Sequence, residues 1–191
     1  MRKSSEFEST VLDLIKSRRS SRAYSDEYIE EEKINSLFEA ARWAPSSGNE
    51  QPWGYLYGTK NDGVWDKIAS TLHKGNSIWA ASAQLLIMSF VRNFFICNGQ
   101  QNLSAKYDLG AANAFLSLQA EHLGLNVHQI GGFDVSKARE ILNIPDSCDP
   151  VVVLAIGYPG EIGSLPDSLK TKELGSRERY LRDEFAKKQF L

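Results

Sequence analysis

Apolar residues recur every three or four positions in the first part of the chain, a spacing that is typical of amphipathic helices. This spacing predicts a helix near residues 8–18 and a second helix that stops before Pro45. The apolar faces consist of Phe7, Val11, Leu14 and Ile15 in the first helix and of Ile34, Leu37, Phe38 and Ala41 in the second. Glu30, Glu31 and Glu32 precede the second face, so negative charge lies where the helix dipole favours it.

The same spacing predicts three further helices. Asp62 can cap a helix over residues 64–72, and Asp134 can cap a short helix that ends before Pro145. A longer helix runs from Leu109 to Leu123, and Gly124 closes it. Small residues in its first half allow a neighbouring helix to approach closely. We therefore expect this helix to lie centrally in the fold, and a subunit interface is one location that fits it.

Four other stretches predict strands. Leu85–Val91 and Val151–Ile156 are nearly continuous apolar runs, which are typical of strands buried on both faces. Tyr55–Tyr57 and Val127–Phe133 predict two more strands. Strands and helices alternate without an internal repeat, so we expect an α+β fold or a mixed three-layer sandwich. Residues 92–107 show no clear period.

Composition limits the class of protein. The chain has 191 residues, of which 42% are hydrophobic and 24% charged, so we expect one soluble domain. Its net charge of −2 argues against a general nucleic-acid binder, and no apolar run is long enough to cross a membrane. The polar start of the chain and two distant cysteines, Cys97 and Cys148, favour the reducing cytoplasm and give little support to a disulfide or metal site.

The stretch Ser17–Arg22 is the densest source of hydrogen-bond donors in the chain, with three arginines and three serines in six residues. Arginine keeps its charge and binds phosphate oxygens in a bidentate manner, and serine can complete the shell. The stretch therefore indicates an anion site, most naturally for a phosphate. The alternative is a solvated cap at the end of the first helix.

Two loops could line a ligand site. Ala44–Trp53 contains two prolines, one glycine and several neutral polar residues, which fits either a plain turn or the polar wall of a site. Gly131 and Gly132 end a predicted strand, and residues without a Cβ atom let the backbone approach a flat ligand closely.

The chain offers no ready reactive group of its own. Common nucleotide, metalloprotease and serine hydrolase motifs are absent. A catalytic histidine has weak support; of the three histidines, His128 near the paired glycines is the best placed. We expect the two cysteines to be inert or surface thiols and the four tryptophans, Trp43, Trp53, Trp65 and Trp79, to lie in the core. This combination suits a cofactor that supplies the chemistry.

The order of these motifs resembles the FMN-dependent nitroreductase family. The matching segments are Arg18–Arg22, Ala44–Trp53, Gly75-Asn76 with Trp79, Asp108–Ala112, His122–Leu125, Ile130–Phe133, Ala155–Pro159 and Arg177–Arg179. The resemblance extends from about residue 11 to residue 182. It implies one α+β domain over residues 1–191, a three-layer α/β/α sandwich around a mixed, mainly antiparallel sheet, and a tail, about 160–191, that is exchanged with a partner subunit.

The resemblance also implies roles for individual residues. Arg18, Ser20, Arg22 and Arg179 would hold the phosphate and ribityl chain of FMN, Arg19 would also bind the cofactor, and Arg177 stands at an often basic position. Pro45, Ser46, Ser47 and Asn49 would contact the flavin from the other subunit of a homodimer. Asn76 would be a further contact, and Ile130, Gly131 and Gly132 would lie beside the flavin ring, with a backbone N–H near N5.

The implied activity is transfer of hydride from NADH or NADPH, through flavin N5, to an electron-poor acceptor such as a nitroaromatic or a quinone. Three alternatives remain open at this point. The same scaffold could carry a dedicated dehalogenation, enal reduction or oxidation; the protein could bind flavin without turnover; or the arginine cluster could bind a phosphate of a protein or nucleic acid.

Overall fold

The computed structural model describes residues 1–189, and a four-stranded sheet is its centre. The strands are β2 (Trp53–Thr59), β3 (Leu85–Arg92), β4 (Asn126–Ile130) and β5 (Cys148–Gly157), in the order β2-β3-β5-β4. All three pairings in this sheet are antiparallel. The two apolar runs form the central strands, as predicted, because only a central strand buries both of its faces here.

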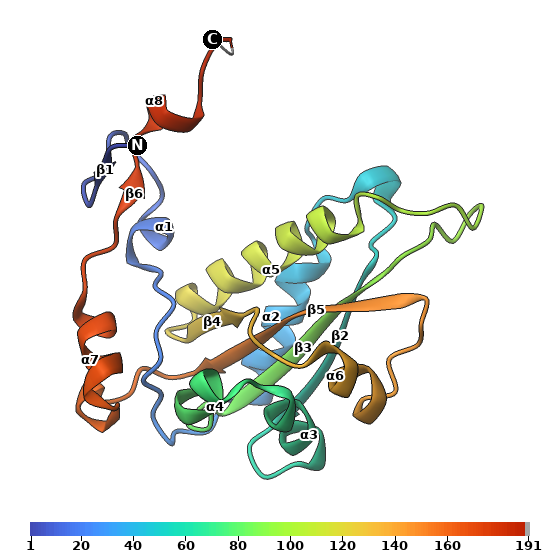
Figure 1. Cartoon of the computed structure of the whole chain (residues 1–191), viewed down its shortest axis with the longest axis horizontal. Coiled ribbons are helices and arrows are strands. Elements are labelled where there is room, and N and C mark those ends of the chain that lie inside the picture. The colour runs from blue at the N-terminus through green and yellow to red at the C-terminus, as the bar shows by residue number, and fades with distance from the viewer. Residues whose placement is uncertain (190–191) are drawn as a thin grey trace.

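One face of the sheet is covered by α2 (Glu31–Arg42) and α5 (Ala105–His122) (Figure 1). Successive side chains of a strand point to opposite faces, so alternate residues of the central strands face these helices. Leu85 and Ile87 of β3 pack there with Leu116 of α5 and Leu37 of α2. The long helix is therefore central, as its sequence predicted.

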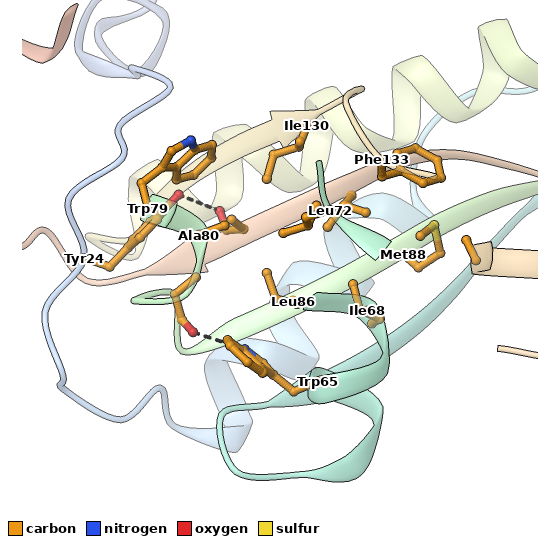
Figure 2. Close-up of a cluster of buried hydrophobic side chains, with 14 of the residues drawn as sticks. Tyr24, Trp65, Ile68, Leu72, Trp79, Ala80, Leu86, Met88, Ile130 and Phe133 are labelled. Carbon is orange, nitrogen blue, oxygen red and sulfur yellow. Dashed lines mark hydrogen bonds between the residues drawn. The ribbon is translucent and has the colours of Figure 1, made fainter. Parts of the chain in front are cut away.

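The opposite face is covered by α3 (Gly63–Thr71), α4 (Lys74–Ala80) and α6 (Val135–Ile141). Leu86 and Met88 of β3 contact this second cluster, which Figure 2 shows. Its buried polar atoms are satisfied: the Tyr24 hydroxyl donates to the Ala155 carbonyl at 2.9 Å and the Trp65 indole donates to the Ala83 carbonyl at 3.1 Å. Helices on both faces make the predicted three-layer α+β sandwich.

The predicted helix ends are confirmed by their capping bonds. The Asp62 carboxylate accepts from the backbone N–H groups of Val64 at 2.6 Å and Trp65 at 3.1 Å, and Asp134 accepts from Lys137 at 2.9 Å. Gly124 follows α5 with a φ of 75°, a conformation that glycine adopts without strain. The pattern did not predict α4, because its apolar residues, Ile78, Trp79 and Ala80, are consecutive at its end and show no helical spacing.

Both ends of the chain leave the sandwich together (Figure 1). The N-terminal part contains β1 (Lys3–Ser4) and α1 (Asp13–Ser17), and the C-terminal part contains α7 (Asp167–Leu174), β6 (Arg179–Tyr180) and α8 (Arg182–Phe185). Strands β1 and β6 pair antiparallel. Helix α1 is shorter than the predicted 8–18, because Phe7 and Ile15 are 52% and 44% exposed and find no core in this subunit.

Two further features differ from the simple pattern. Trp43, expected in the core, is 69% exposed; its indole donates to Glu39 at 2.8 Å and the Arg42 guanidinium lies 5.0 Å from its ring centre. Trp65 and Trp79 are buried, as expected. The stretch without a period forms a small hairpin in which Phe94 bridges to Gln101.

Within residues 1–189, we find no helix that combines the length and the apolar character needed to cross a membrane.

Candidate functional site

A basic pocket forms where the two ends of the chain meet. Its volume is about 360 Å³, and it is lined by Arg18, Arg19, Ser20, Arg22, Lys172, Glu173, Gly175, Ser176, Arg177, Glu178 and Arg179. The two contributing segments, 18–22 and 172–179, lie 150 positions apart in the sequence. The structure therefore brings together the six residues of these segments for which the resemblance implied cofactor binding, four from the start of the chain and two from its end.

The charge balance of this pocket favours an anion. Five arginines and Lys172 line it, against two glutamates, Glu173 and Glu178. Partial burial lowers the pKa of Arg177, and the nearby charges of Arg19, Arg18 and Arg179 lower it further. Cations that repel one another at this density are stabilised by a bound anion. A phosphate group would supply that charge and accept several of their hydrogen bonds.

Two of the arginines are occupied by backbone carbonyls. The Arg19 guanidinium donates to the carbonyls of Glu173 at 3.0 Å and Gly175 at 2.8 Å. The Arg177 guanidinium donates to the carbonyls of Arg18 and Lys16. These contacts join the N-terminal segment to the end of α7, so Arg19 and Arg177 hold the shape of the pocket.

Of the remaining three arginines, one is paired with a carboxylate and two keep most of their hydrogen-bond donors. Arg22 pairs with the Glu173 carboxylate at 3.5 Å, and its backbone N–H donates to the same carboxylate at 3.2 Å. Arg18 donates only a long bond of 3.4 Å to Ser20 Oγ, and Arg179 donates to the adjacent Glu178 carbonyl. Among the contacts of residues 1–189, Arg18 and Arg179 thus keep the most donors for a ligand.

The His128 imidazole contacts the backbone of the arginine segment. Its Nδ1 lies 3.2 Å from the Ser21 carbonyl, which also accepts from the Tyr24 hydroxyl at 3.1 Å. The Trp79 ring centre is 4.5 Å away. Burial lowers the pKa of His128, and the positive charge of Arg22 lowers it further. A neutral imidazole can donate from Nδ1 to the Ser21 carbonyl. Because Ser21 lies between Ser20 and Arg22, this hydrogen bond indicates that His128 positions these two residues.

A second pocket adjoins the basic one and shares Arg18 and Ser20 with it. Its volume is about 340 Å³, and its other lining residues are Ala114, Ser117, Leu118, Val127 and Gln129. The sequence analysis did not single out Ser117 or Gln129. The alternation along β4 is the signal that could have found Gln129, since it points away from the face that holds His128.

Of the paired glycines, only Gly132 contacts Asn76. Asn76 Nδ2 donates to the Gly132 carbonyl at 3.0 Å, and a Cβ atom on Gly132 would lie 2.5 Å from the same nitrogen. Only glycine therefore fits at position 132 with Asn76 in place. Gly131 is exposed and a Cβ there would meet nothing, whereas the Ile130 side chain is buried in the core and can offer only backbone to a ligand.

The loop with the neutral polar residues lies elsewhere in the subunit. Pro45 and Ser46 follow α2, and Ser47 and Asn49 bound a short 3₁₀ turn. The backbone N–H of Ser47 donates to Asp108 in the first turn of α5 at 3.2 Å. Asp108 and the pocket residue Ser117 are nine positions apart, or roughly 13 Å along the helix axis. The structure does not bring this loop to the basic pocket within one chain.

The fold and the site define an α+β protein with a pocket lined by five arginines and Lys172. The family model of the nitroreductase family matches residues 15–84 and 67–158. The chain belongs to this family.

Two curated relatives support the assignment. A protein of Archaeoglobus fulgidus that carries the provisional name NADH dehydrogenase/NAD(P)H nitroreductase is 30% identical over 157 residues, which is 78% of this chain and 84% of the relative. The FMN reductase (NAD(P)H) of Bacillus subtilis is 27% identical over 192 residues, which is 91% of this chain and 76% of the relative.

One solved structure is similar over nearly the whole chain. The crystal structure of an oxidoreductase containing FMN superposes with a TM-score of 0.91 at 31% identity, and the match covers 97% of this chain and 96% of that one. The similarity therefore includes the two terminal segments as well as the sandwich.

Proposed function

We propose that this protein is an FMN-dependent oxidoreductase that uses NADH or NADPH to reduce a small electron-poor acceptor, such as a nitroaromatic or a quinone. The observation that carries the proposal is the pocket in which Arg18, Ser20 and Arg22 meet Arg177 and Arg179. The similarity to an oxidoreductase containing FMN and to an FMN reductase supports the choice of cofactor.

The donor set fits FMN. Arg18 and Arg179 offer charged donors to a phosphate, while Ser20 adds a hydroxyl beside them. The adjoining pocket continues from Arg18 and Ser20 to the apolar side chains of Leu118 and Val127, which suit the less polar part of such a ligand. A phosphate at one end and a largely apolar body at the other is the layout that these two pockets would accommodate.

FMN, when bound, supplies the two-electron redox chemistry, because it can accept hydride from a nicotinamide and pass it to an acceptor. The residues of this chain then bind and orient it. Arg18 and Arg179 fix the phosphate end, and Arg22, supported by His128, contributes positive potential along the same segment. The backbone of Gly131 and Gly132 can approach the ring closely because neither residue has a Cβ atom.

We further propose that a second copy of the chain completes the site. The loop that contains Pro45, Ser46, Ser47 and Asn49 lies away from the basic pocket of its own chain, so it would reach the flavin of a partner. The paired terminal segments leave the sandwich, and the tail from about residue 160 to residue 189 would contact the partner there. The last two residues of the predicted exchanged tail, 190 and 191, lie outside the described residues. Measuring the mass in solution by light scattering tests this: a monomer would contradict it.

The test of the main proposal is spectroscopic. Purified protein should be yellow or should take up FMN on titration, and the colour should bleach anaerobically with NADH or NADPH and return on addition of a quinone or nitroaromatic. Protein that takes up no flavin would contradict the proposal and favour an anion-binding module. Yellow protein that neither nicotinamide bleaches would leave a flavoprotein without this activity. The acceptor, the nicotinamide preference and the cytoplasmic location stay predictions.

A further inference from the structure

Gln129 is the most distinctive polar group of the second pocket. It is exposed at the surface of β4 and lines the pocket beside Arg18 and Ser20. Its Nε2 atom donates to Ser117 Oγ at 3.1 Å and to the Asn113 carbonyl at 3.4 Å, both on α5. The amide is thus held on its nitrogen side.

The orientation of this amide follows from its partners. A carbonyl oxygen can only accept, so the atom that faces the Asn113 carbonyl must be the amide nitrogen. The hydroxyl of Ser117 donates its own hydrogen to the same carbonyl at 2.7 Å, and it is therefore an acceptor toward Gln129 as well. Since the nitrogen faces α5, the Oε1 atom faces away from it. No hydrogen bond to Oε1 is found within residues 1–189.

The partners of Gln129 are themselves fixed in the interior. Asn113 and Ser117 are 2% and 5% exposed. The Asn113 side chain accepts from the Tyr55 hydroxyl at 3.0 Å and donates to Ser89 Oγ at 3.4 Å, and Ser89 is fully buried. A buried network in which each member has a partner is rigid. The Gln129 oxygen is therefore a preorganised acceptor, which lowers the cost of binding a donor.

The neighbours of this oxygen indicate what it binds. Arg18 supplies positive charge at one end of the pocket, and Leu118 and Val127 supply an apolar wall. We propose that Gln129 accepts a hydrogen bond from a hydroxyl of the polyol chain that joins the phosphate of a bound flavin to its ring. This inference rests on the proposed function, and it adds a residue that selects flavins with a hydroxylated chain.

The test uses three flavins and the apoprotein, with fluorescence titration as the readout. Riboflavin lacks the phosphate but keeps the polyol, and lumiflavin lacks both. For Gln129→Leu we expect roughly five- to tenfold weaker binding of FMN and of riboflavin, the effect of one hydrogen bond, and unchanged binding of lumiflavin. Ser117→Ala, which removes one anchor of the amide, should weaken the same two ligands by a smaller factor.

The matched control is Gln119→Leu. Gln119 also lies on the surface of the sandwich, but its amide donates to Ser36 Oγ at 2.9 Å on α2 and does not line the pocket. This variant should bind all three flavins as the unchanged protein does. Equal affinity of Gln129→Leu for FMN, or an equal loss with lumiflavin, would overturn the inference. Failure of the unchanged protein to bind FMN would instead overturn the proposed function.

Discussion

The basic pocket and the polar loop after α2 differ in how they are built. The pocket gathers charged side chains from the two ends of the chain, and two of its arginines, Arg19 and Arg177, are held by carbonyls of the opposite segment. The loop is one continuous stretch that is neutral apart from Glu50: the Ser47 backbone N–H donates to the Asp108 carboxylate, and Glu50 pairs with Arg92 at 2.8 Å.

This difference teaches how each region would respond to a ligand. The pocket carries a surplus of positive charge, so an anion should stabilise it. The loop has its charges paired, so its shape is set before any ligand arrives. The predictions below separate these two behaviours, and they run from the largest expected effect to the smallest.

Arg18→Ala should cause the largest loss of cofactor. Arg18 lines the basic pocket and its neighbour and has few contacts of its own, so the change removes a charge-assisted phosphate contact. A loss of about 1.5–3 kcal/mol in binding free energy corresponds to roughly 10- to 150-fold weaker FMN binding. Titration with FMN and riboflavin checks it, because riboflavin should be little affected. Arg42→Ala, which removes an exposed pair with Glu39 and the contact of Arg42 with the Trp43 ring, is the control.

Gly132→Ala should destabilise the turn after β4, where Gly132 contacts Asn76 of α4. The added Cβ would lie 2.5 Å from Asn76 Nδ2, so the Asn76 side chain must leave the Gly132 carbonyl. We expect a loss of about 1–3 kcal/mol in the free energy of unfolding, measured with urea. In an Asn76→Ala background the same change should cost clearly less, since the clash is gone. Equal costs in both backgrounds would contradict the assignment.

The His128 imidazole should give the basic region a pH dependence. Its pKa in the folded protein is lowered, so its contribution to stability is full above the unfolded value of about 6.5 and is lost as pH falls from there through the folded pKa. The groups that face it are Arg22, Glu173 and the Trp79 ring. Thermal unfolding between pH 8 and pH 5 should show a smaller decline in His128→Gln. An unchanged decline would assign it to other groups.

Glu50→Gln should have the smallest effect, confined to the polar loop and the hairpin that its carboxylate holds at residues 93–102. The Glu50 carboxylate accepts from the Ile96 backbone at 2.9 Å and from Arg92, and these bonds lower its pKa. The stabilisation is therefore present above the unfolded pKa and lost as pH falls through the folded value. Hydrogen exchange at neutral pH should become faster in residues 93–102 while FMN affinity stays unchanged. A loss of FMN affinity comparable to that of Arg18→Ala would contradict the separation of the two regions.

The sandwich was largely predictable, because local chemistry and burial act in the same direction there. Asp62 and Asp134 cap the helices that follow them, and the two apolar runs form the central strands. Prediction failed where burial was decided by distant contacts. Trp43 is exposed because α2 ends beside solvent, and α1 is short because its apolar side chains face no core within the subunit.

The sequence by itself determined the chemistry available: arginines and serines for an anion, neutral polar loops, paired glycines and no reactive nucleophile. Only the tertiary structure decided how these groups divide their work. It joined Arg177 and Arg179 to Arg18 across the length of the chain, committed Arg19 and Arg177 to carbonyls, and turned the Gln129 amide by contacts with buried residues of α5. Hydrogen-bond partners distant in sequence set these roles, and periodicity along the chain carries no record of them.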